Sequence, residues 1–339
     1  MTANKLNFGL VGAGMIGKVH AEHLKRRINQ ASLEAIADVN EQAARETAAR
    51  LDVPRATTDY HELLVDPAID AVVICSSTDT HAQIIGEAAL AGKHIFCEKP
   101  IDFSLARIDA ALETVSRAGV QLQIGFNRRF DANFARVRQA VTSGEIGQPH
   151  LLHIISRDPE PPTPEYVKTS GGIFMDMTIH DFDMARFLIG SEVEEIFTYG
   201  GVRIDPEIGK AGDLDTALVL LKFSDGTLGT IDNSEKAAYG YDQRVEVFGS
   251  LGAIQIGNNY PNSAIISSGQ SIHHDRPLYF FIQRYTESYI AELEQFTQAI
   301  LANKPVPVSG QEGRMPVVMA LAARKSYDEN RPVKLAEVG

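Results

Sequence analysis

The stretch Leu6-Asn-Phe-Gly-Leu-Val-Gly12-Ala-Gly14-Met-Ile-Gly17 determines the fold class of this chain. Leu6–Val11 has the composition of a short buried strand, and Lys18–Ile28 has the hydrophobic spacing of a helix. Between them lies a G-x-G-x-x-G pattern, whose glycines allow a tight turn, a close approach of a pyrophosphate and close packing of helix against strand. This pattern predicts a dinucleotide-binding loop. Its predicted cofactor-binding residues are Gly12, Gly14, Met15, Ile16 and Gly17.

An acidic residue follows this loop at the spacing that a dinucleotide site requires. A second predicted strand, Leu33–Ala37, ends at Asp38, about 20 residues after the last glycine. A carboxylate there accepts hydrogen bonds from the ribose hydroxyls of NAD and repels the 2′-phosphate of NADP. The following Val39-Asn40 supplies no cation to offset that repulsion. The sequence therefore predicts NAD as the cofactor; a glycine-rich turn with an incidental Asp is the alternative.

Strand and helix patterns continue to alternate along the first third of the chain, which predicts a doubly wound parallel sheet. The expected elements are strands at Ala56-Thr57, Ala71–Cys75 and His94–Glu98 and helices at Glu41–Leu51, Tyr60–Leu64 and Ala82–Ala91. Ligands bind at the carboxyl ends of strands in such sheets. Ser76, Ser77 and His81 follow one of these strands, so they are candidate cofactor contacts, whereas Thr78 and Thr80 are expected to cap the next helix.

A lysine stands at the end of another predicted strand, in Glu98-Lys99-Pro100. The proline ends the strand and restricts Lys99 to an extended conformation. This places the ammonium group of Lys99 at the carboxyl edge of the sheet, near the nicotinamide end of a bound dinucleotide. Glu98 and Lys99 are therefore both candidate cofactor contacts. A solvated side chain is the alternative for a single lysine at a strand end.

The segment Gly171-Gly-Ile-Phe-Met-Asp176-Met-Thr-Ile-His180-Asp-Phe-Asp183 places an acid and an imidazole four residues apart. Apolar residues at Met175, Ile179 and Phe182 follow helical spacing, so one helix is predicted with Asp176 and His180 on the same face. A carboxylate beside an imidazole can fix its tautomer and favour its protonated form, as a proton-transfer site requires. A surface ion pair on an amphipathic helix is the alternative.

Composition excludes several classes of partner. The chain has 339 residues, enough for two domains, and its net charge of −12 argues against nucleic acid or an anionic membrane as a partner. No stretch approaches the ~18 apolar residues of a membrane span. Met1–Lys5 lacks the hydrophobic region of a signal peptide. Since Cys75 and Cys97 have the setting of buried thiols in a reducing compartment, a soluble cytoplasmic protein is expected.

The remaining histidines do not indicate a metal site. His94 and His153 lie inside apolar strands and are expected to be core residues. His273-His274-Asp275 contains metal-ligating residue types, but nothing nearby in the sequence completes a recognisable ligand set. We therefore expect an ordinary loop at this position, and we predict no metal ion.

Together these motifs resemble the glucose–fructose oxidoreductase / inositol dehydrogenase / rhizopine-catabolism (Gfo/Idh/MocA) family over essentially the whole chain. Glu98-Lys99-Pro100 and the Gly171–Asp183 segment are specific to that family. Three further segments favour its inositol dehydrogenases. These are Gln123–Asp131, Arg157-Asp158-Pro159 and Tyr239–Gly249.

The resemblance implies a two-domain α/β architecture. Residues 1–125 would form the NAD-binding Rossmann domain, and residues 126–339 a substrate-binding and oligomerisation domain with a large, mostly antiparallel open sheet. Family members commonly associate through the exposed face of that sheet, which implies a homotetramer. The runs that fit its strands are His150–Ser156, Glu194–Tyr199, Asp215–Lys222, Gly226–Ser234, Arg244–Gly249 and Gly252–Ile256.

The resemblance also implies a catalytic site formed by Lys99, Asp176 and His180, which match the family pattern without departure. His180 would act as the base, Asp176 would orient it, and Lys99 would stabilise the reacting oxygen or share the proton relay. These three residues would also bind the substrate. Further candidate substrate contacts are Asn127, Asp158, Tyr239 and Tyr241, with cross-strand packing as the alternative for each tyrosine.

The activity implied by the resemblance is NAD-dependent oxidation of a secondary alcohol on a cyclic polyol. The first expectation is myo-inositol oxidised to its 2-ketone. The same chemistry on scyllo-inositol or on an aldopyranose is an alternative, because different ring hydroxyl orientations need only a few changed contacts. An alternative of another class is a non-catalytic protein that senses NAD and binds another protein.

Overall fold

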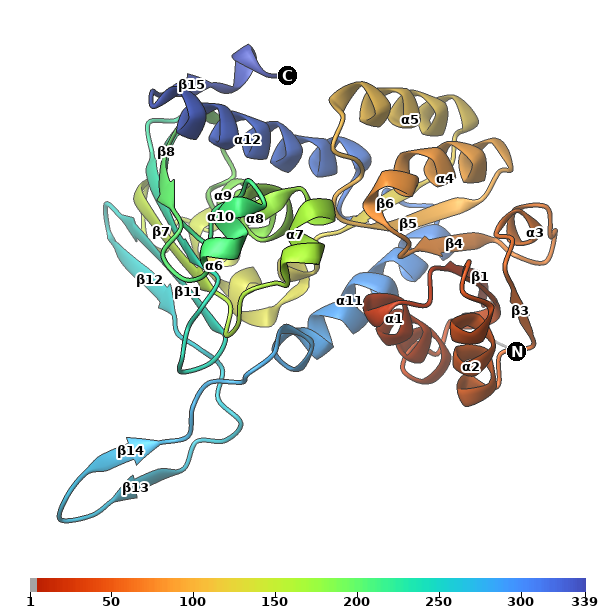
Figure 1. Ribbon diagram of the computed structural model, residues 1–339, viewed down its shortest axis with the longest axis horizontal. Coiled ribbons are helices and arrows are strands. Elements are labelled where there is room, and N and C mark those ends of the chain that lie inside the picture. Colours follow the sequence, from red (N-terminus) through yellow and green to blue (C-terminus); the bar gives the residue numbers. More distant parts are fainter. Residues whose placement is uncertain (1–4) are drawn as a thin grey trace. The chain divides into compact units, whose positions relative to one another are not determined.

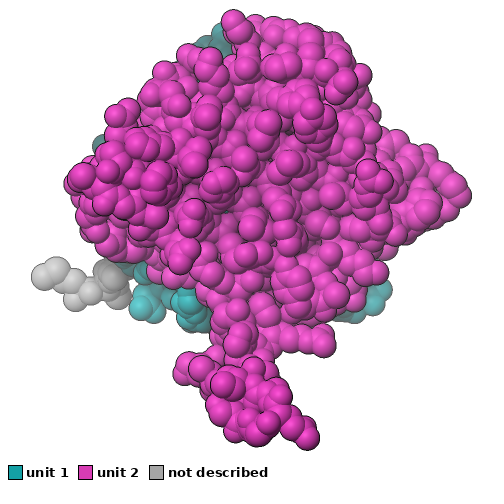
Figure 2. Space-filling view, turned by 90° about the vertical axis from the view of Figure 1, so that its left-hand side faces the viewer, with its two compact units in different colours: residues 1–130, 287–315 teal, residues 131–286, 316–339 magenta. Residues whose placement is uncertain are grey.

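The structure is a computed structural model that describes residues 5–339 and divides the chain into two compact units. Unit 1 comprises residues 1–130 and 287–315, and unit 2 comprises residues 131–286 and 316–339 (Figure 2). Residues 1–4 lie outside the described residues. They include most of Met1–Lys5, the segment expected to lack the hydrophobic region of a signal peptide. The division differs from the predicted single boundary at residue 125, because a C-terminal segment returns to unit 1.

Among the described residues of unit 1, six strands form one parallel sheet in the order β3-β2-β1-β4-β5-β6 (Figure 1). This is the strand order of the Rossmann fold. The strands read as nearly continuous apolar runs because helices bury a parallel sheet on both faces. The strands are β1 (Leu6–Val11), β2 (Ala31–Ala37), β3 (Arg55–Thr57), β4 (Ala71–Ile74), β5 (His94–Glu98) and β6 (Leu122–Gly125).

Helices connect successive strands of unit 1, as the alternating pattern predicts. They are α1 (Met15–Arg26), α2 (Glu41–Leu51), α3 (His61–Leu64), α4 (Thr78–Leu90) and α5 (Leu105–Ala118), with a short η1 (Asn127–Phe130) after β6. A helix from the C-terminal part of the chain, α11 (Phe281–Leu301), contributes Leu293 and Phe296 to the same core as Phe8 and Phe96. Sequence periodicity did not predict this contribution.

Two helices contain the boundaries between the units, and each has a feature at its boundary that a regular helix lacks. In α11, Tyr285 has non-helical backbone angles (φ −114°, ψ 16°) just before the unit boundary. In α12 (Gly310–Glu329), Pro316 lies inside the helix at the second boundary. Proline has no backbone N–H, so α12 lacks one hydrogen-bond donor of its helical ladder at this boundary.

In the described part of unit 2, seven strands form a sheet in the order β12-β11-β7-β10-β9-β8-β15. The pair β7–β10 is parallel and the other pairs are antiparallel. The predicted mostly antiparallel sheet is therefore confirmed, with β15 added at one edge. Its strands are β7 (Pro149–Arg157), β8 (Val193–Gly201), β9 (Thr216–Phe223), β10 (Leu228–Ser234), β11 (Asp242–Gly249), β12 (Gly252–Ile256) and β15 (Val333–Lys334).

The two faces of this sheet differ in their cover. Helices α6 (Ala132–Thr142) and α9 (Thr178–Ile189) pack on one face, and alternate residues of β9 are buried there. The other face exposes large apolar side chains. These are Leu151, Tyr199, Leu218, Leu220, Leu228 and Phe248. Such a patch is unusual for a surface that faces only water, so it indicates an interaction site.

The remaining elements of unit 2 are short. They are α7 (Pro164–Ser170), α8 (Gly172–Asp176), α10 (Pro206–Lys210), the two-stranded pair β13 (Ile265–Ser267) and β14 (Ile272–His274), and η2 (Leu335–Glu337). Figure 1 shows β13 and β14 as an extended arm. The loop expected at His273-His274 was wrong: both residues lie in β14, and their side chains are exposed.

Two expectations from composition concern the cysteines and possible membrane spans. Cys75 and Cys97 are buried free thiols, as expected from their apolar surroundings in the sequence. Within residues 5–339, the structure contains no helix that combines the length and the apolar character needed to cross a membrane.

Candidate functional site

The glycine loop of unit 1 has the geometry that its sequence pattern requires. Gly12 adopts φ +99°, and a Cβ atom there would lie 2.6 Å from the backbone of Cys75. A Cβ on Gly17 would clash with the carbonyl oxygen of Gly12, so a side chain at that position would force the helix away from the strand. Around Gly14, by contrast, no described atom lies within 4 Å of the Cβ position. The loop thus leaves open space where a pyrophosphate would approach the start of α1.

Asp38 connects the end of β2 to this loop. Its Oδ2 accepts a hydrogen bond from the Ala13 N–H at 2.6 Å, and its Oδ1 accepts one from the Asn40 N–H at 2.8 Å. Asp38 is only partly buried, so its carboxylate can also receive ribose hydroxyls. These residues fit an NAD molecule: the loop is open at Gly14, and the predicted ribose acceptor is fixed beside it.

Replacing Asp38 tests the basis of cofactor choice. We expect Asp38→Ser to lower the ratio of kcat/KM with NAD to kcat/KM with NADP by about 100-fold, because a charge that repels the 2′-phosphate is removed. Steady-state kinetics with both cofactors measures this ratio. Glu41→Gln is the matched control, because Glu41 is an exposed acid nearby that pairs with Arg45. Comparable use of both cofactors by the wild type would contradict the role of Asp38.

Three candidate cofactor contacts follow β4. Ser77 is exposed at the start of α4, and Ser76 is half-buried with its Oγ 2.7 Å from Thr80 Oγ1. His81 is buried. Its Nδ1 lies 2.8 Å from the carbonyl oxygen of Pro100, and its Nε2 lies 3.0 Å from that of Ser76. Both ring nitrogens of His81 therefore lie against backbone carbonyl oxygens, which fixes the ring in place, and its role as a cofactor contact stays a prediction.

Three further predicted residues lie at the carboxyl edge of the same sheet. Glu98 is the last residue of β5, Lys99 follows it, and Asn127 begins η1 two residues after the end of β6. Asn127 is buried, and its amide nitrogen has no hydrogen-bond partner among the described side chains and backbone. A buried amide without a partner is costly, so this group has the character of a ligand contact. Lys99 is partly exposed.

In unit 2 the predicted acid–imidazole pair is not on one continuous helix. Asp176 is the last residue of α8, Met177 joins the two helices (φ −92°, ψ −61°), and His180 lies in the first turn of α9. The single helix predicted from apolar spacing was therefore wrong, because periodicity does not detect a local break of this kind. Both side chains are half-buried.

A buried hydrogen-bond network fixes α9 against the sheet. Thr178 Oγ1 donates to Asn233 Oδ1 at 2.7 Å, and Asn233 Nδ2 donates to Asp181 Oδ2 at 2.8 Å and to the carbonyl oxygen of Ser156 at 3.2 Å. All of these groups are buried, and such networks hold elements in a unique position. His180, one residue before Asp181, is thereby held on a rigid element.

Asp213 determines how the chain enters α8. Its carboxylate accepts a hydrogen bond from the Ile173 N–H at 2.9 Å and approaches Gly172 so closely that a Cβ there would lie 2.6 Å from Oδ1. Gly172 also has φ +78°, which a residue with a side chain rarely adopts. Gly172 therefore has a structural explanation, which the sequence pattern alone did not supply.

Two further residues lie near Asp176 and were not predicted. The hydroxyl of Tyr166 donates to Asp176 Oδ1 at 3.2 Å. Glu235 is buried, and burial together with the charges of Asp158 and Asp176 raises its pKa to about 9. Glu235 is therefore a neutral carboxylic acid at neutral pH, able to donate a hydrogen bond. Neither residue lies in a recognisable local motif, so the sequence offered no signal for them.

The protonation of Glu235 has a consequence for stability. The folded chain keeps a proton on Glu235 up to pH about 9, whereas the unfolded chain releases it near the ordinary glutamate pKa of 4.5. Stability is therefore lost as pH rises between these values. We measure the free energy of unfolding of Glu235→Gln and of the wild type in urea. The difference, variant minus wild type, should rise by about 1–3 kcal/mol between pH 5.5 and pH 8. Glu194→Gln, at an exposed position, is the control; an equal effect of Glu235→Gln at both pH values would contradict the assignment.

Two of the predicted substrate contacts meet at a cavity in unit 2. Asp158 and Tyr241 line a cavity of about 140 Å³. Its other lining residues are Pro159, Glu160, Tyr279, Phe280 and Phe281. Tyr241 is buried and packs edge-on against Tyr285, with ring centroids 6.0 Å apart. Aromatic side chains with a few polar groups are common in the lining of ligand pockets, and this cavity has such a lining.

Tyr239 has a different environment. Its hydroxyl donates to Asp242 and accepts a hydrogen bond from Arg157 Nη1 at 3.2 Å. Burial and the hydrogen bond to Asp242 raise the pKa of Tyr239, so the phenol stays neutral. Its side chain is exposed, but its hydroxyl is part of this ion-pair network. The substrate contact predicted for Tyr239 stays a prediction.

Comparison with known proteins identifies the family. A family model described as an oxidoreductase family with an NAD-binding Rossmann fold matches residues 6–126, and one described as the GFO/IDH/MocA C-terminal domain matches residues 134–255. The myo-inositol 2-dehydrogenase of Thermotoga maritima is 51% identical over 333 residues, which cover 98% of this chain and 99% of that protein. This chain belongs to the Gfo/Idh/MocA oxidoreductase family.

Solved structures agree with this fold. A crystal structure of a probable dehydrogenase from Thermotoga maritima is 51% identical, with a TM-score of 0.97, covering 98% of this chain and all of that one. Scyllo-inositol dehydrogenase from Lactobacillus casei, solved with bound NAD(H) and scyllo-inositol, is 31% identical, with a TM-score of 0.92 over 98% of this chain and all of that one. The predicted family, fold class and NAD cofactor are confirmed, and the chain is an NAD-dependent oxidoreductase.

Proposed function

We propose that this chain oxidises myo-inositol to 2-keto-myo-inositol with NAD. The observation that carries the proposal is the 51% identity to a myo-inositol 2-dehydrogenase over nearly the full length of both chains. Identity at this level extends through both units rather than the cofactor domain alone. It therefore covers the second unit, where substrate discrimination is expected in a fold with a separate cofactor domain.

The proposed catalytic residues include the base and the cation that the reaction needs. A ring hydroxyl is too weak an acid to lose its proton unaided at neutral pH, so a base and a positive group are needed at the reacting oxygen. We assign His180 as the base, Asp176 as the residue that orients it, and Lys99 as the cation that stabilises the developing alkoxide or shares the proton relay. Hydride acceptance is the chemistry that NAD supplies when bound.

Several residues of unit 2 support recognition of a polyol. Asp158 and Tyr241 share the cavity described above, and Asp176 is joined by the Tyr166 hydroxyl. Glu235, held neutral by burial, adds a donor where the neighbouring carboxylates are acceptors. A polyol presents hydroxyls that both donate and accept, so a mixed set of this kind suits it. Analogues that leave one of these buried groups unpaired would be rejected.

A panel of substrates tests the proposal. Inositol stereoisomers and aldoses are assayed with NAD and with NADP, following the absorbance of the reduced cofactor. We expect the highest kcat/KM with myo-inositol and NAD. Preference for an aldose would overturn the substrate assignment. A wild type inert with every polyol would favour the NAD-sensing alternative.

Scyllo-inositol is the second candidate substrate. It is supported by the likeness to the Lactobacillus casei scyllo-inositol dehydrogenase. The two substrates share a ring and differ in the orientation of one hydroxyl, so a few changed contacts separate them. A higher kcat/KM with scyllo-inositol in the same panel would replace the first assignment with this one.

We also propose that the enzyme is a cytoplasmic homotetramer. The exposed apolar face of the unit 2 sheet, which includes Leu218 and Leu220, supports association with further copies of the chain. The two buried free thiols are compatible with a reducing compartment. Light scattering coupled to gel filtration measures the molar mass; a monomer would contradict the association, and a secreted protein in cell fractionation would contradict the location.

A further inference from the structure

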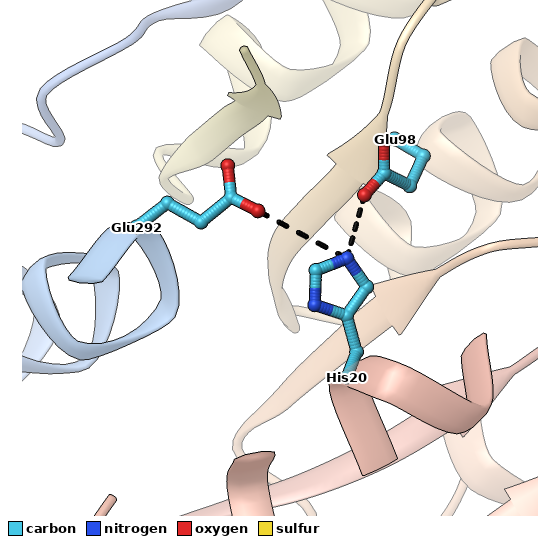
Figure 3. Close-up of side chains that lie close together, drawn as sticks. All are labelled: His20, Glu98 and Glu292. Carbon is cyan, nitrogen blue, oxygen red and sulfur yellow. Dashed lines mark hydrogen bonds and ion pairs between the residues drawn. The ribbon is translucent and has the colours of Figure 1, made fainter. Parts of the chain in front are cut away.

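A cluster of three buried ionisable side chains lies in unit 1, and two of its members were not predicted from the sequence. His20 comes from α1, Glu98 from the end of β5 and Glu292 from α11 (Figure 3). His20 and Glu292 are completely buried, and Glu98 is 8% exposed. Burying an ionisable group is costly unless it is paired or neutral, so the protonation of this cluster needs an explanation.

The distances favour hydrogen bonding over metal binding. His20 Nε2 lies 2.6 Å from Glu98 Oε1 and 4.0 Å from Glu292 Oε1. Each residue could offer one ligand atom to an ion. However, tetrahedral zinc, with ligands at about 2.0–2.2 Å, separates them by about 3.3 Å. A separation of 2.6 Å is instead that of a charge-assisted hydrogen bond between His20 and Glu98.

The surroundings of His20 indicate a neutral imidazole with its proton on Nε2. The other ring nitrogen, Nδ1, is buried and has no hydrogen-bond partner among the described residues. The ring packs edge-on against Phe96 and Tyr289. An imidazolium would bury a charged N–H donor without an acceptor, whereas a neutral ring leaves only an unused acceptor there. The Nε2–H of His20 therefore donates to a carboxylate on Glu98.

Glu292 is the neutral member of the cluster. Both of its carboxyl oxygens are buried without a hydrogen-bond partner in the described part of the chain. Burial, together with the charge of Glu98, holds the pKa of Glu292 well above its usual range. With His20 and Glu292 both uncharged, the cluster carries one negative charge, and that charge is on Glu98.

Glu98 places this charge at the cofactor end of the sheet. It is the last residue of β5 and directly precedes Lys99. In the Rossmann fold, the half of the sheet that contains β4, β5 and β6 receives the nicotinamide mononucleotide part of the cofactor. The carboxylate also lies against Gly125 at the end of β6, where a Cβ would be 3.1 Å from Glu98 Oε2.

We infer that Glu98, held as a carboxylate by His20, favours binding of the oxidised cofactor over binding of the reduced cofactor. Without the charge on Glu98, the ratio of the Kd for NAD+ to the Kd for NADH would be higher. The nicotinamide ring is positively charged when oxidised and neutral when reduced, so a nearby negative charge stabilises only the oxidised form. The inference rests on the proposed NAD-dependent oxidation, and it names Glu98 as a residue that discriminates between the two redox states of the cofactor.

The test measures the two dissociation constants without substrate, by calorimetry for NAD+ and by cofactor fluorescence for NADH. We expect Glu98→Gln to raise the Kd for NAD+ about tenfold and to change the Kd for NADH less than about twofold. Glu98→Asp, which keeps the charge, should retain most of the wild-type ratio of the two constants. Glu113→Gln is the control, because Glu113 is an exposed acid on α5 paired with Arg117.

Three results would overturn the inference. An unchanged ratio in Glu98→Gln would show that the charge does not discriminate. Equal loss of the ratio in Glu98→Asp and Glu98→Gln would show that side-chain shape, rather than charge, is responsible. A ratio that falls in Glu292→Gln as in Glu98→Gln would place the charge on Glu292. If the wild type bound neither cofactor form, the proposed function itself would fail, which is a distinct outcome.

Discussion

Lys99→Ala should lower kcat with myo-inositol by about 10³- to 10⁴-fold while the chain still folds and binds NAD. The expected loss is large because a cation beside a developing alkoxide acts mainly in the transition state, where removing one such donor costs about 10²–10³ and removing a proton relay costs more. Kd for NAD+ should rise less than about fivefold, because Lys99 contributes one of many cofactor contacts. Steady-state kinetics and calorimetry on the same preparation separate these effects.

Lys304→Ala is the matched control for this experiment. Lys304 is exposed in unit 1, far along the sequence from the Glu98-Lys99-Pro100 motif. Its replacement by Ala removes the same charge and the same side chain as Lys99→Ala. It should leave kcat and Kd unchanged. A Lys99→Ala enzyme with more than about a tenth of wild-type kcat would remove Lys99 from the proposed catalytic residues.

His180→Gln should lower kcat about 10³-fold and remove an ionisation near neutrality from the pH–rate profile. A general base contributes about 10²–10⁴ to the rate, and the rate depends on its unprotonated fraction. The wild type should therefore gain activity as pH rises through this ionisation, and the variant should not. His273→Gln, at an exposed position on the β13–β14 arm, is the control and should behave as the wild type.

Combining the two substitutions tests whether Lys99 and His180 act on the same proton. Residues that work as one unit show strongly non-additive losses. We expect the kcat of the double variant, Lys99→Ala with His180→Gln, to be no more than about tenfold below that of the less active single variant. A double variant whose loss equals the product of both single losses would indicate two independent roles, which would contradict a shared proton-transfer site.

Local sequence signals predicted the backbone geometry of the glycine loop well. The G-x-G-x-x-G loop and Asp38 have the predicted geometry, because that geometry depends on residues close together in sequence and on backbone shapes that only glycine allows. The strands of the second sheet were also located, since alternation of buried and exposed residues is a direct consequence of strand geometry.

Other features could not be predicted because they depend on long-range contacts or on local breaks. The helix break at Met177 separates Asp176 from His180 without interrupting the apolar spacing. His81 bonds to the carbonyl oxygen of Pro100, which fixes it in the scaffold. Glu292 reaches His20 and Glu98 of the Rossmann domain from α11, far along the chain. In each case the deciding partner is distant in sequence or is the backbone.

The most direct test of the central claim is the fate of the hydrogen at C2 of myo-inositol. The enzyme is given NAD+ and myo-inositol carrying deuterium at C2, and the reduced cofactor is examined by mass spectrometry. Direct transfer from that carbon predicts NADH that contains one deuterium for each 2-keto-myo-inositol formed. Unlabelled NADH formed from this substrate would contradict oxidation at C2.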